Sequence, residues 1–428
     1  MASTAPVERR VSADPRFPNF NGLRAVAALA VVLTHLADTG GANAPNILGV
    51  FFARMDGGVA IFFVISGVLL YRPFARAHLL DEPRPNLVPY LWRRGLRIYP
   101  AYWLATTVVV YVLGVTEIPS LKSFLLDYSL LHIYSPHQPD VFAPLVQSWT
   151  LATEVAFYLF LPLWSWFMAR VVRGEARRRV RTELIGVGVL VVGSAAWKAL
   201  VLGVGFSDPR IGQFKLWLPW WLDLFAAGMG LAVLSVAIQH VGWRVPAHLD
   251  RRRAAAYCWL GALGTFWWVA AGAGLGHTTA AIPHSLLWGQ HYLYGATALL
   301  LVLPAVFGPQ ERATSRIHWF LQTRVMVFLG SISYGIYLWH EGWIDRYLHW
   351  TDLAFRGVYF SDTPFVWHTN RFISVPWFVF GAAILALTIA SASLSWFGLE
   401  RPLLSLKHRF DGAGSKPRNR PPGSEPVW

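Results

Sequence analysis

Residues 21–38 read NGLRAVAALAVVLTHLAD, an apolar run that begins after Arg24 and holds His35 near its far end. A helical run of this length can cross the roughly 30 Å of hydrocarbon in a bilayer. Arg9, Arg10 and Arg16 precede residues 21–38, so a signal peptide cleaved near Ala42-Asn43-Ala44 is an alternative interpretation. The hydrophobic region of a signal peptide is normally purely apolar, whereas Arg24 and His35 bracket this one. We therefore expect a first membrane span that is retained.

Apolar runs of this kind recur along the chain. Hydrophobic residues make up 55% of the 428 residues and charged residues 14%, and the mean hydropathy is +0.41. A soluble domain carries roughly 25% charged residues. We expect an all-α, polytopic integral membrane protein with about ten transmembrane helices. The expected spans are 21–38, 57–72, 98–115, 148–170, 184–203, 215–237, 255–275, 288–308, 325–345 and 374–397.

The basic residues, which give a net charge of +14, lie mainly in alternate loops between these runs. By the positive-inside rule, this alternation places both termini in the cytoplasm of a cell whose inner (plasma) membrane holds the protein. Loop 346–373, with three arginines, is an exception. The arginine-rich loops are 73–97, 171–183, 238–254 and 309–324, and the poor ones are 39–56, 116–147, 204–214 and 276–287.

One membrane domain, 18–405, accounts for most of the chain. The polar ends, 1–17 and 406–428, are predicted to be disordered and cytoplasmic. No basic stripe beside a folded soluble domain is visible, so a nucleic-acid partner is not expected. The single cysteine, Cys258, excludes an intrachain disulfide and a thiolate metal cluster. Neither a metal site nor a tightly bound cofactor is predicted.

Ionisable residues inside spans are costly and are therefore candidate functional residues. Arg24 and His35 lie eleven residues apart, about 16 Å along one helix, with Arg24 toward the cytoplasm. The predicted topology brings His35, Glu154, Asp223 and His340 from four spans toward the outer half of the bilayer. Each has a structural alternative, such as an interhelical hydrogen bond or a place at the membrane interface. Their convergence is what favours a buried site.

Six motifs occur in order along the spans. They are Arg24-AVAALAVVLT-His35, Gly57-Gly58-VAIFFVI-Ser66-Gly67, Arg93-Arg94-GL-Arg97-I-Tyr99-Pro100, Trp149-Thr150-Leu151-AT-Glu154-VA-Phe157-Tyr158, Ser333-Tyr334-GI-Tyr337-LW-His340 and Glu400-Arg401-Pro402. With these motifs the chain resembles acyltransferase family 3, membrane-bound O-acyltransferases of the O-antigen acetylase and macrolide acyltransferase type, over about residues 18–405. Two departures are Thr150, where the family often has Ser, and Gly342, where it often has Pro.

The resemblance implies an enzyme that transfers an acyl group, often acetyl from acetyl-CoA, to a hydroxyl group. Acceptors in the family include cell-surface polysaccharides, O-antigen, peptidoglycan and secreted glycolipids or macrolides. The implied partners are therefore the lipid bilayer, acyl-CoA as donor substrate, and a hydroxyl-bearing glycan, glycolipid or macrolide-like acceptor.

O-acylation requires a base for the hydroxyl proton, and imidazole suits this role near neutral pH. We expect His35 to be the general base, with an acyl-imidazole relay as an alternative, and Glu154 to orient it. CoA phosphates need cations on the cytoplasmic side, which Arg24, Arg93, Arg94 and Arg97 can supply. Candidates for supporting the site or contacting the acceptor are Ser66, Tyr158, Asp223, Tyr337 and His340.

A secondary transporter or a polysaccharide or lipid flippase is the main alternative from another functional class. Such a protein would have a midplane cavity and broken helices in paired halves. The arginines at the start of the third span fit donor binding better than an ion path. A scaffold or receptor is a further alternative, but it would not require buried polar residues.

Overall fold

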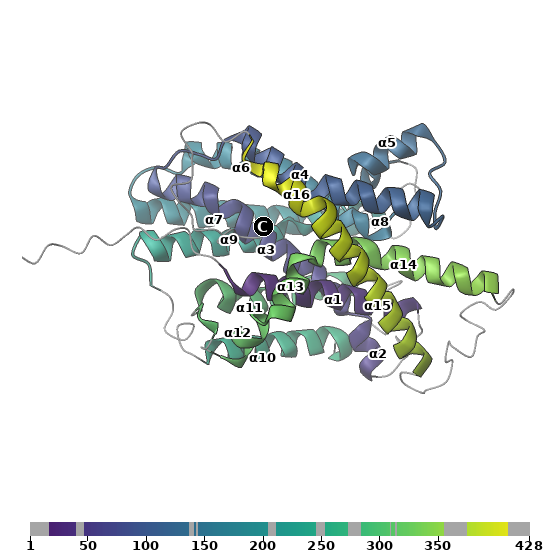
Figure 1. Cartoon of the computed structure of the whole chain (residues 1–428). Coiled ribbons are helices and arrows are strands. Elements are labelled where there is room, and N and C mark those ends of the chain that lie inside the picture. The colour runs from purple at the N-terminus through teal and green to yellow at the C-terminus, as the bar shows by residue number, and fades with distance from the viewer. Residues whose placement is uncertain are drawn as a thin grey trace, which may run out of the picture.

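The computed structural model describes residues 17–39, 47–136, 141–142, 144–203, 211–244, 253–272, 284–308, 310–312, 315–354 and 375–409. Every element in these ranges is helical, and none of the described residues lies in a strand, which confirms the all-α class (Figure 1). The α-helices are α1 (Asn19–Thr39), α2 (Ile47–Phe52), α3 (Gly58–Leu80), α4 (Leu87–Thr107), α5 (Leu121–Ser129), α6 (Trp149–Val171), α7 (Ala176–Gly203), α8 (Ile211–Phe214), α9 (Leu218–His240), α10 (Ala254–Trp267), α11 (His284–Phe307), α12 (Arg316–Leu321), α13 (Arg324–Ser331), α14 (Ser333–Ala354), α15 (Val375–Ser395) and α16 (Arg401–Leu404).

Shorter helical turns connect or extend these helices. Three of them are π-helical, and each begins at the residue that directly follows an α-helix. The short turns are η1 (Met55–Gly57), η2 (Val108–Val112), η3 (His132–Tyr134), η5 (Val146–Ser148), η6 (Trp268–Gly272), η8 (Trp396–Glu400) and η9 (Ser405–His408).

Eight helical segments of the described chain are long and apolar enough to cross a membrane, and they coincide with eight expected spans. The expected span 98–115 corresponds to the second half of α4 with η2. The expected span 325–345 is not one helix, because α13 ends at Ser331 and α14 begins at Ser333. Charged side chains lower the hydropathy of α4 and α14. Helix α4 carries three arginines, and α14 carries Glu341, Asp345 and Arg346. The total of about ten spans and the cytoplasmic termini stay predictions of the sequence pattern.

Several helices extend beyond the expected spans. Much of the expected loops 73–97 and 171–183 is helical, because α3 continues to Leu80, α4 begins at Leu87 and α7 begins at Ala176. The loop assignment is wrong there. Helical hydrogen bonds persist past the hydrocarbon boundary, and arginine side chains can carry their charge outward from a helix to water.

Parts of the expected disordered ends are ordered. Phe17 is buried and its ring stacks on Phe20 at a centroid distance of 4.8 Å. Residues 405–408 form η9, and the indole of Trp92 on α4 donates a hydrogen bond to the carbonyl oxygen of Leu406 at 3.0 Å. Residues 1–16 and 410–428 lie outside the described residues.

Glycines allow close contact between the central helices. Helix α3 packs along α9, where a Cβ atom on Gly67 would overlap the carbonyl oxygen of Phe225. A Cβ atom on Gly228 would likewise overlap the carbonyl oxygen of Val64. A Cβ atom on Gly58 would come within 2.5 Å of the carbonyl oxygen of Ala27 on α1. Small residues permit such backbone contact in membranes, where van der Waals packing holds helices together.

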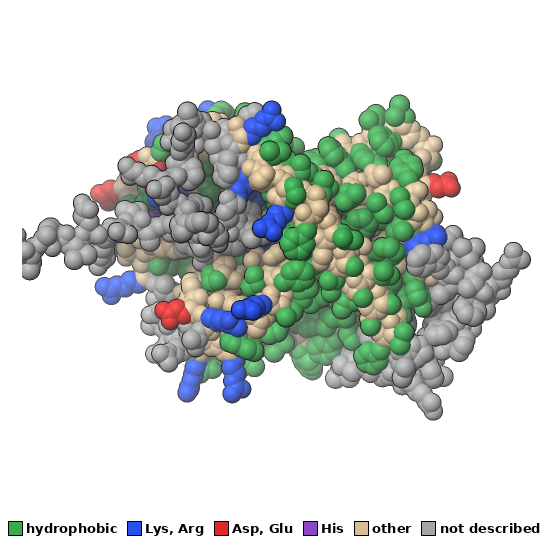
Figure 2. All heavy atoms as spheres, in the orientation of Figure 1, with side chains coloured by type: hydrophobic (Ala, Val, Ile, Leu, Met, Phe, Trp, Pro, Cys, Tyr) green, Lys and Arg blue, Asp and Glu red, His purple; other side chains and the backbone are tan. Residues whose placement is uncertain are grey.

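Helix α1 lies in the interior of the bundle, with α3, α11, α12, α13 and α14 packed around it. Figure 2 shows hydrophobic side chains over much of the visible surface, while lysines and arginines gather mainly on the left half. A helix surrounded by others at membrane depth can expose polar side chains to an interior site and not to lipid. Arg24 and His35 on α1 are therefore placed to face such a site.

Candidate active site

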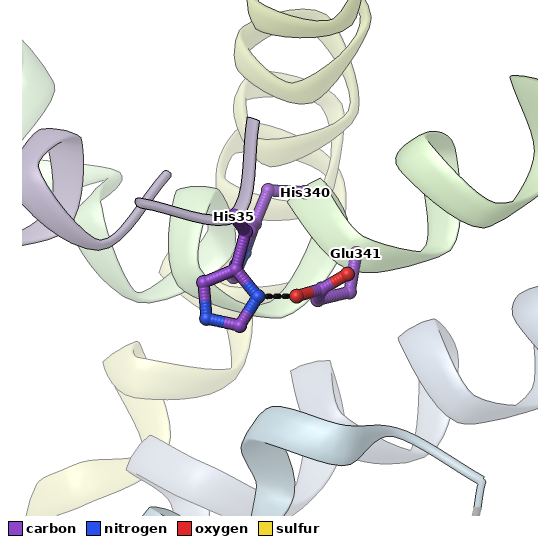
Figure 3. Close-up of side chains that lie close together, drawn as sticks. All are labelled: His35, His340 and Glu341. Atoms are coloured by element: carbon purple, nitrogen blue, oxygen red, sulfur yellow. Dashed lines mark ion pairs between the residues drawn. The ribbon is translucent and has the colours of Figure 1, made fainter. Parts of the chain in front are cut away.

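A histidine and a glutamate from neighbouring helices meet near the C-terminal end of α1. Nδ1 of His35 contacts the Glu341 carboxylate of α14 (Figure 3). The side chain of Glu341 is 11% exposed and that of His35 is 28% exposed, so the pair is partly accessible from one side. When a carboxylate holds Nδ1–H, Nε2 is the nitrogen that can accept a proton.

Packing on both sides fixes the two helices that carry this pair. On α1, the hydroxyl of Thr34 donates to the carbonyl oxygen of Phe52 at 3.0 Å. On α14, Gly342 lies against Val109 of η2, and an added Cβ atom would come within 2.5 Å of Val109 Cγ2. The family's common proline is absent at position 342, and the structure places a close helix contact there.

His340 lies beside the pair and is fully buried. Its ring centroid is 5.1 Å from that of His35, and the two rings are nearly perpendicular. Neither of its ring nitrogens has a hydrogen-bond partner among the described residues. A buried polar group without a partner costs about 1–3 kcal/mol, so this ring is a candidate for binding something else.

A second polar group surrounds Arg24, about 16 Å along α1 from His35. Arg24 lies within electrostatic range of Arg94 and Arg97 of α4 and of Glu154 and Tyr158 of α6. Nε of Arg94 and Nη1 of Arg97 are buried and have no hydrogen-bond partner among the described residues. The cluster therefore offers guanidinium donors that no described protein group uses.

Aromatic rings cover the remaining faces of these arginines. The guanidinium of Arg94 lies 5.9 Å from the ring centroid of Tyr158, and that of Arg97 lies 5.6 Å from Tyr334. Glu400, the last residue of η8, is buried and interacts electrostatically with Arg97. Among the described residues of this cluster, three arginines accompany two carboxylates, Glu154 and Glu400, and this excess of cationic groups suits an anion.

The structure corrects the expected role of Glu154 as the carboxylate that orients His35. Its Oε1 accepts hydrogen bonds from Ser66 Oγ at 2.9 Å and from Tyr158 OH at 2.8 Å. Glu154 therefore belongs to the Arg24 cluster, together with Ser66 and Tyr158, and Glu341 is the carboxylate at His35. Sequence spacing did not reveal this, because it gives no information on which span neighbours α1 at a given depth.

Arg93 was expected to join the donor-binding arginines, but it is not among the groups acting on Arg24 in the described part of the chain. Around α4 it lies about 100° from Arg94 and about 40° from Arg97. Three of the four predicted arginines are therefore brought together.

Tyr337 connects the two polar groups. Its ring lies 5.8 Å from that of His340, one helical turn away on α14. Its hydroxyl lies 2.8 Å from that of Thr150 and donates to the carbonyl oxygen of Gln147 at 3.2 Å. Thr150 is one turn from Glu154 on α6, so Tyr337 has a supporting position between the pair at His35 and the arginine cluster.

Asp223 of α9 belongs to a separate cluster and does not join this site. Its carboxylate accepts from Lys198 Nζ of α7 at 2.8 Å and lies 2.9 Å from Nε2 of His291 of α11. All three side chains are buried. The network joins three helices and satisfies its own charges, which indicates the structural alternative for Asp223.

Comparison with known proteins identifies a family whose model covers most of the chain. A family model described as an acyltransferase domain, that of acyltransferase family 3, matches residues 17–396. The acyltransferase MdmB of Streptomyces mycarofaciens is 25% identical over 358 residues, which cover 78% of this chain and 80% of that protein. The exopolysaccharide production protein ExoZ of Rhizobium meliloti is 32% identical over 152 residues, 31% of this chain and 45% of ExoZ.

A third relative is longer than the matched region. The peptidoglycan O-acetyltransferase OatA of Listeria monocytogenes is 28% identical over 210 residues, which cover 45% of this chain and 30% of OatA. The matched parts thus span less than half of ExoZ and less than a third of OatA. No solved structure matches the chain at a significant level.

Proposed function

The chain belongs to acyltransferase family 3, and from this premise we propose that it transfers an acyl group, acetyl in the first instance, from acyl-CoA to a hydroxyl of a carbohydrate or related acceptor. The family and the apolar helices identify it as a membrane acyltransferase. The names of OatA and ExoZ refer to peptidoglycan and exopolysaccharide, which supports a cell-surface or secreted acceptor here. We assign the protein to the inner (plasma) membrane on its loop charges.

The observation that carries the proposal is the arrangement of polar groups on α1. One end of the helix bears an imidazole paired with a carboxylate, and the other end lies in a cluster of arginines. The two are separated by about 16 Å along the helix. An extended donor with an anionic end and a reactive end fits this separation.

His35 acts as the general base in the proposed reaction. Its Nε2 takes the proton from the acceptor hydroxyl as the oxygen attacks the carbonyl carbon of the thioester. The C–S bond then breaks, the proton passes from the imidazolium to the sulfur, and CoA leaves as the free thiol. Glu341 holds Nδ1–H and stabilises the imidazolium that forms in between.

The arginine cluster binds the donor. Phosphate oxygens of CoA accept hydrogen bonds from the guanidinium groups of Arg24, Arg94 and Arg97. The pantetheine arm then runs along α1 toward His35 and carries the thioester with it. Tyr337 lies between the two groups and supports that path.

The test separates donor binding from transfer. Wild type and His35→Ala are purified, and binding of acetyl-CoA is measured by equilibrium dialysis. Cells that produce either protein are then compared by mass spectrometry of surface glycans and secreted metabolites. We expect His35→Ala to bind acetyl-CoA as wild type does but to transfer at least about 100-fold less acetyl.

A matched control is His240→Ala, which removes an exposed histidine at the end of α9. This variant should transfer at the wild-type rate. Transfer by His35→Ala at a near wild-type rate would contradict the role of His35 as general base. A wild-type protein that does not bind acetyl-CoA would contradict the assignment of acyl-CoA as the donor.

A further inference from the structure

Three side chains that commonly bind metal ions meet at the His35 end of α1. His35, His340 and Glu341 each offer one ligand atom, and these atoms all lie within 4.8 Å of one another. Figure 3 shows the carboxylate of Glu341 pointing toward the ring of His35, with His340 close behind that ring. Because α1 supplies one residue and α14 the other two, the set depends on the packing of these helices.

The mechanism proposed above leaves His340 unexplained. Its ring is fully buried, and both ring nitrogens are without a hydrogen-bond partner among the described residues. Buried polar groups in native proteins are nearly always paired. A neutral imidazole nitrogen is also the commonest metal ligand, so a cation beside His35 would give one of these two nitrogens a partner.

We propose that His35, His340 and Glu341 form a binding site for one zinc ion. Two imidazoles and one carboxylate are a known ligand set for Zn²⁺, and they leave a fourth position for water or another ligand. Magnesium and calcium prefer oxygen ligands, so two imidazoles select against them.

The geometry requires only a small adjustment. Tetrahedral ligands about 2.0 Å from zinc are roughly 3.3 Å apart, somewhat closer than the largest separation in this set. The side chain of His35 is 28% exposed, which gives an ion access to the otherwise buried group. Zinc enters by replacing the direct contact between His35 and Glu341 with two metal–ligand bonds.

Zinc binding has a consequence that rests on the proposed function of His35. The nitrogen lone pairs of a base must be free to accept the proton of the acceptor hydroxyl. Zinc and that proton compete for the same imidazole and its carboxylate. Bound zinc therefore inhibits acyl transfer, and a chelator restores it.

The test is metal content, measured on the full chain with an affinity tag that contains no histidine. Protein is stripped with a chelator, dialysed against Zn²⁺, and analysed for bound metal by mass spectrometry and for affinity by calorimetry. We expect one zinc per wild-type chain. His340→Ala and Glu341→Gln should each weaken binding at least about tenfold, the smallest loss seen even when outer-shell partners of a metal are changed.

Two exposed positions provide matched controls. His240→Ala and Glu117→Gln should bind zinc as wild type does. His340→Gln repeats the ligand loss with a larger side chain, and size-exclusion chromatography shows whether each variant remains folded. Absence of stoichiometric zinc in wild type, or equal affinity in the His340 and Glu341 variants, overturns the site. Stoichiometric zinc with undiminished transfer supports the site but contradicts the base role of His35.

Discussion

Glu341 of α14 contacts Nδ1 of His35 of α1, and the contact assigns different tasks to the two nitrogens of the ring. Nδ1 carries the proton that the carboxylate holds, and Nε2 is left to react. The carboxylate that makes this contact is therefore that of Glu341 and not that of Glu154, which the sequence predicted. Glu341 directly follows His340 in the sequence.

Glu341→Gln should lower the turnover number for acyl transfer by about 100-fold while leaving the KM for acyl-CoA near that of wild type. The amide cannot stabilise the imidazolium and can hold the ring in the wrong tautomer. Steady-state kinetics of CoA release with a thiol reagent measures both constants. Glu117→Gln, at an exposed loop position, is the control and should match wild type.

The contrast with Glu154→Gln makes this prediction specific. Glu154 accepts from Ser66 and Tyr158 inside the arginine cluster, so its loss should change the KM for the donor more than the turnover number. If Glu154→Gln lowers turnover and Glu341→Gln does not, the assignment of the orienting carboxylate is reversed.

Arg94→Ala should raise the Kd for acetyl-CoA by about ten- to 100-fold. A hydrogen bond between a guanidinium and a phosphate contributes about 1.5–3 kcal/mol, and 1.4 kcal/mol corresponds to a tenfold change in affinity. Arg93→Ala is the matched variant at the next position, and it should weaken binding less because Arg93 does not join the cluster at Arg24. Equal effects of the two substitutions would argue against the cluster as the donor site.

Sequence patterns predicted the helices and much of the cluster, since charge and hydropathy are local properties. The eleven-residue spacing of Arg24 and His35 already separates the two ends of the site. The partner of His35 could not be predicted in this way. It depends on α14 packing beside α1 at one depth, and neighbours in a helical bundle are set by tertiary packing.

The arginine motif of α4 shows the same limit at finer scale. Arg93, Arg94 and Arg97 are equivalent as charges near a membrane interface, so topology rules treat them alike. In the structure, Arg94 and Arg97 act electrostatically on Arg24, and Arg93 is not among the groups that do so in the described part of the chain. The sequence pattern likewise did not predict how far the helices extend beyond the expected spans. Hydropathy indicates which residues can lie in the hydrocarbon layer, but it does not indicate where a helix ends.

Gly67→Ala should destabilise the protein by about 1–3 kcal/mol, because the methyl group would overlap the carbonyl oxygen of Phe225 and force α3 away from α9. Thermal unfolding in detergent, followed by tryptophan fluorescence, measures the change. Gly188→Ala in α7 is the control. An added Cβ atom there meets nothing within 4 Å, so the helix should gain about 0.5–1 kcal/mol. A Gly67→Ala protein as stable as wild type would show that the two backbones do not approach so closely.

Because His132 is buried, we expect the folded protein to lose stability on mild acidification. It lies in η3, outside the membrane spans, and burial lowers the pKa of its imidazole to about 4. An unfolded chain would protonate this histidine near pH 6.5, so the folded state should lose about 1.4 kcal/mol for each pH unit between about 6.5 and 4. Above the pKa of His132 in the unfolded chain, the imidazole is neutral in both states and the folded protein keeps its full stability.

The variant His132→Gln removes this titration but keeps a polar group near Ser148, whose hydroxyl lies 3.1 Å from Nε2 of His132. Unfolding free energies of both proteins at pH 7.5 and pH 5 isolate the effect, because every other histidine titrates alike in the pair. Wild type should lose about 2 kcal/mol more than the variant over this range. An equal loss in both proteins would mean that His132 is protonated in the folded state at pH 5. Its Nδ1 is buried and has no hydrogen-bond partner among the described residues. The surrounding segment would then have to open to water.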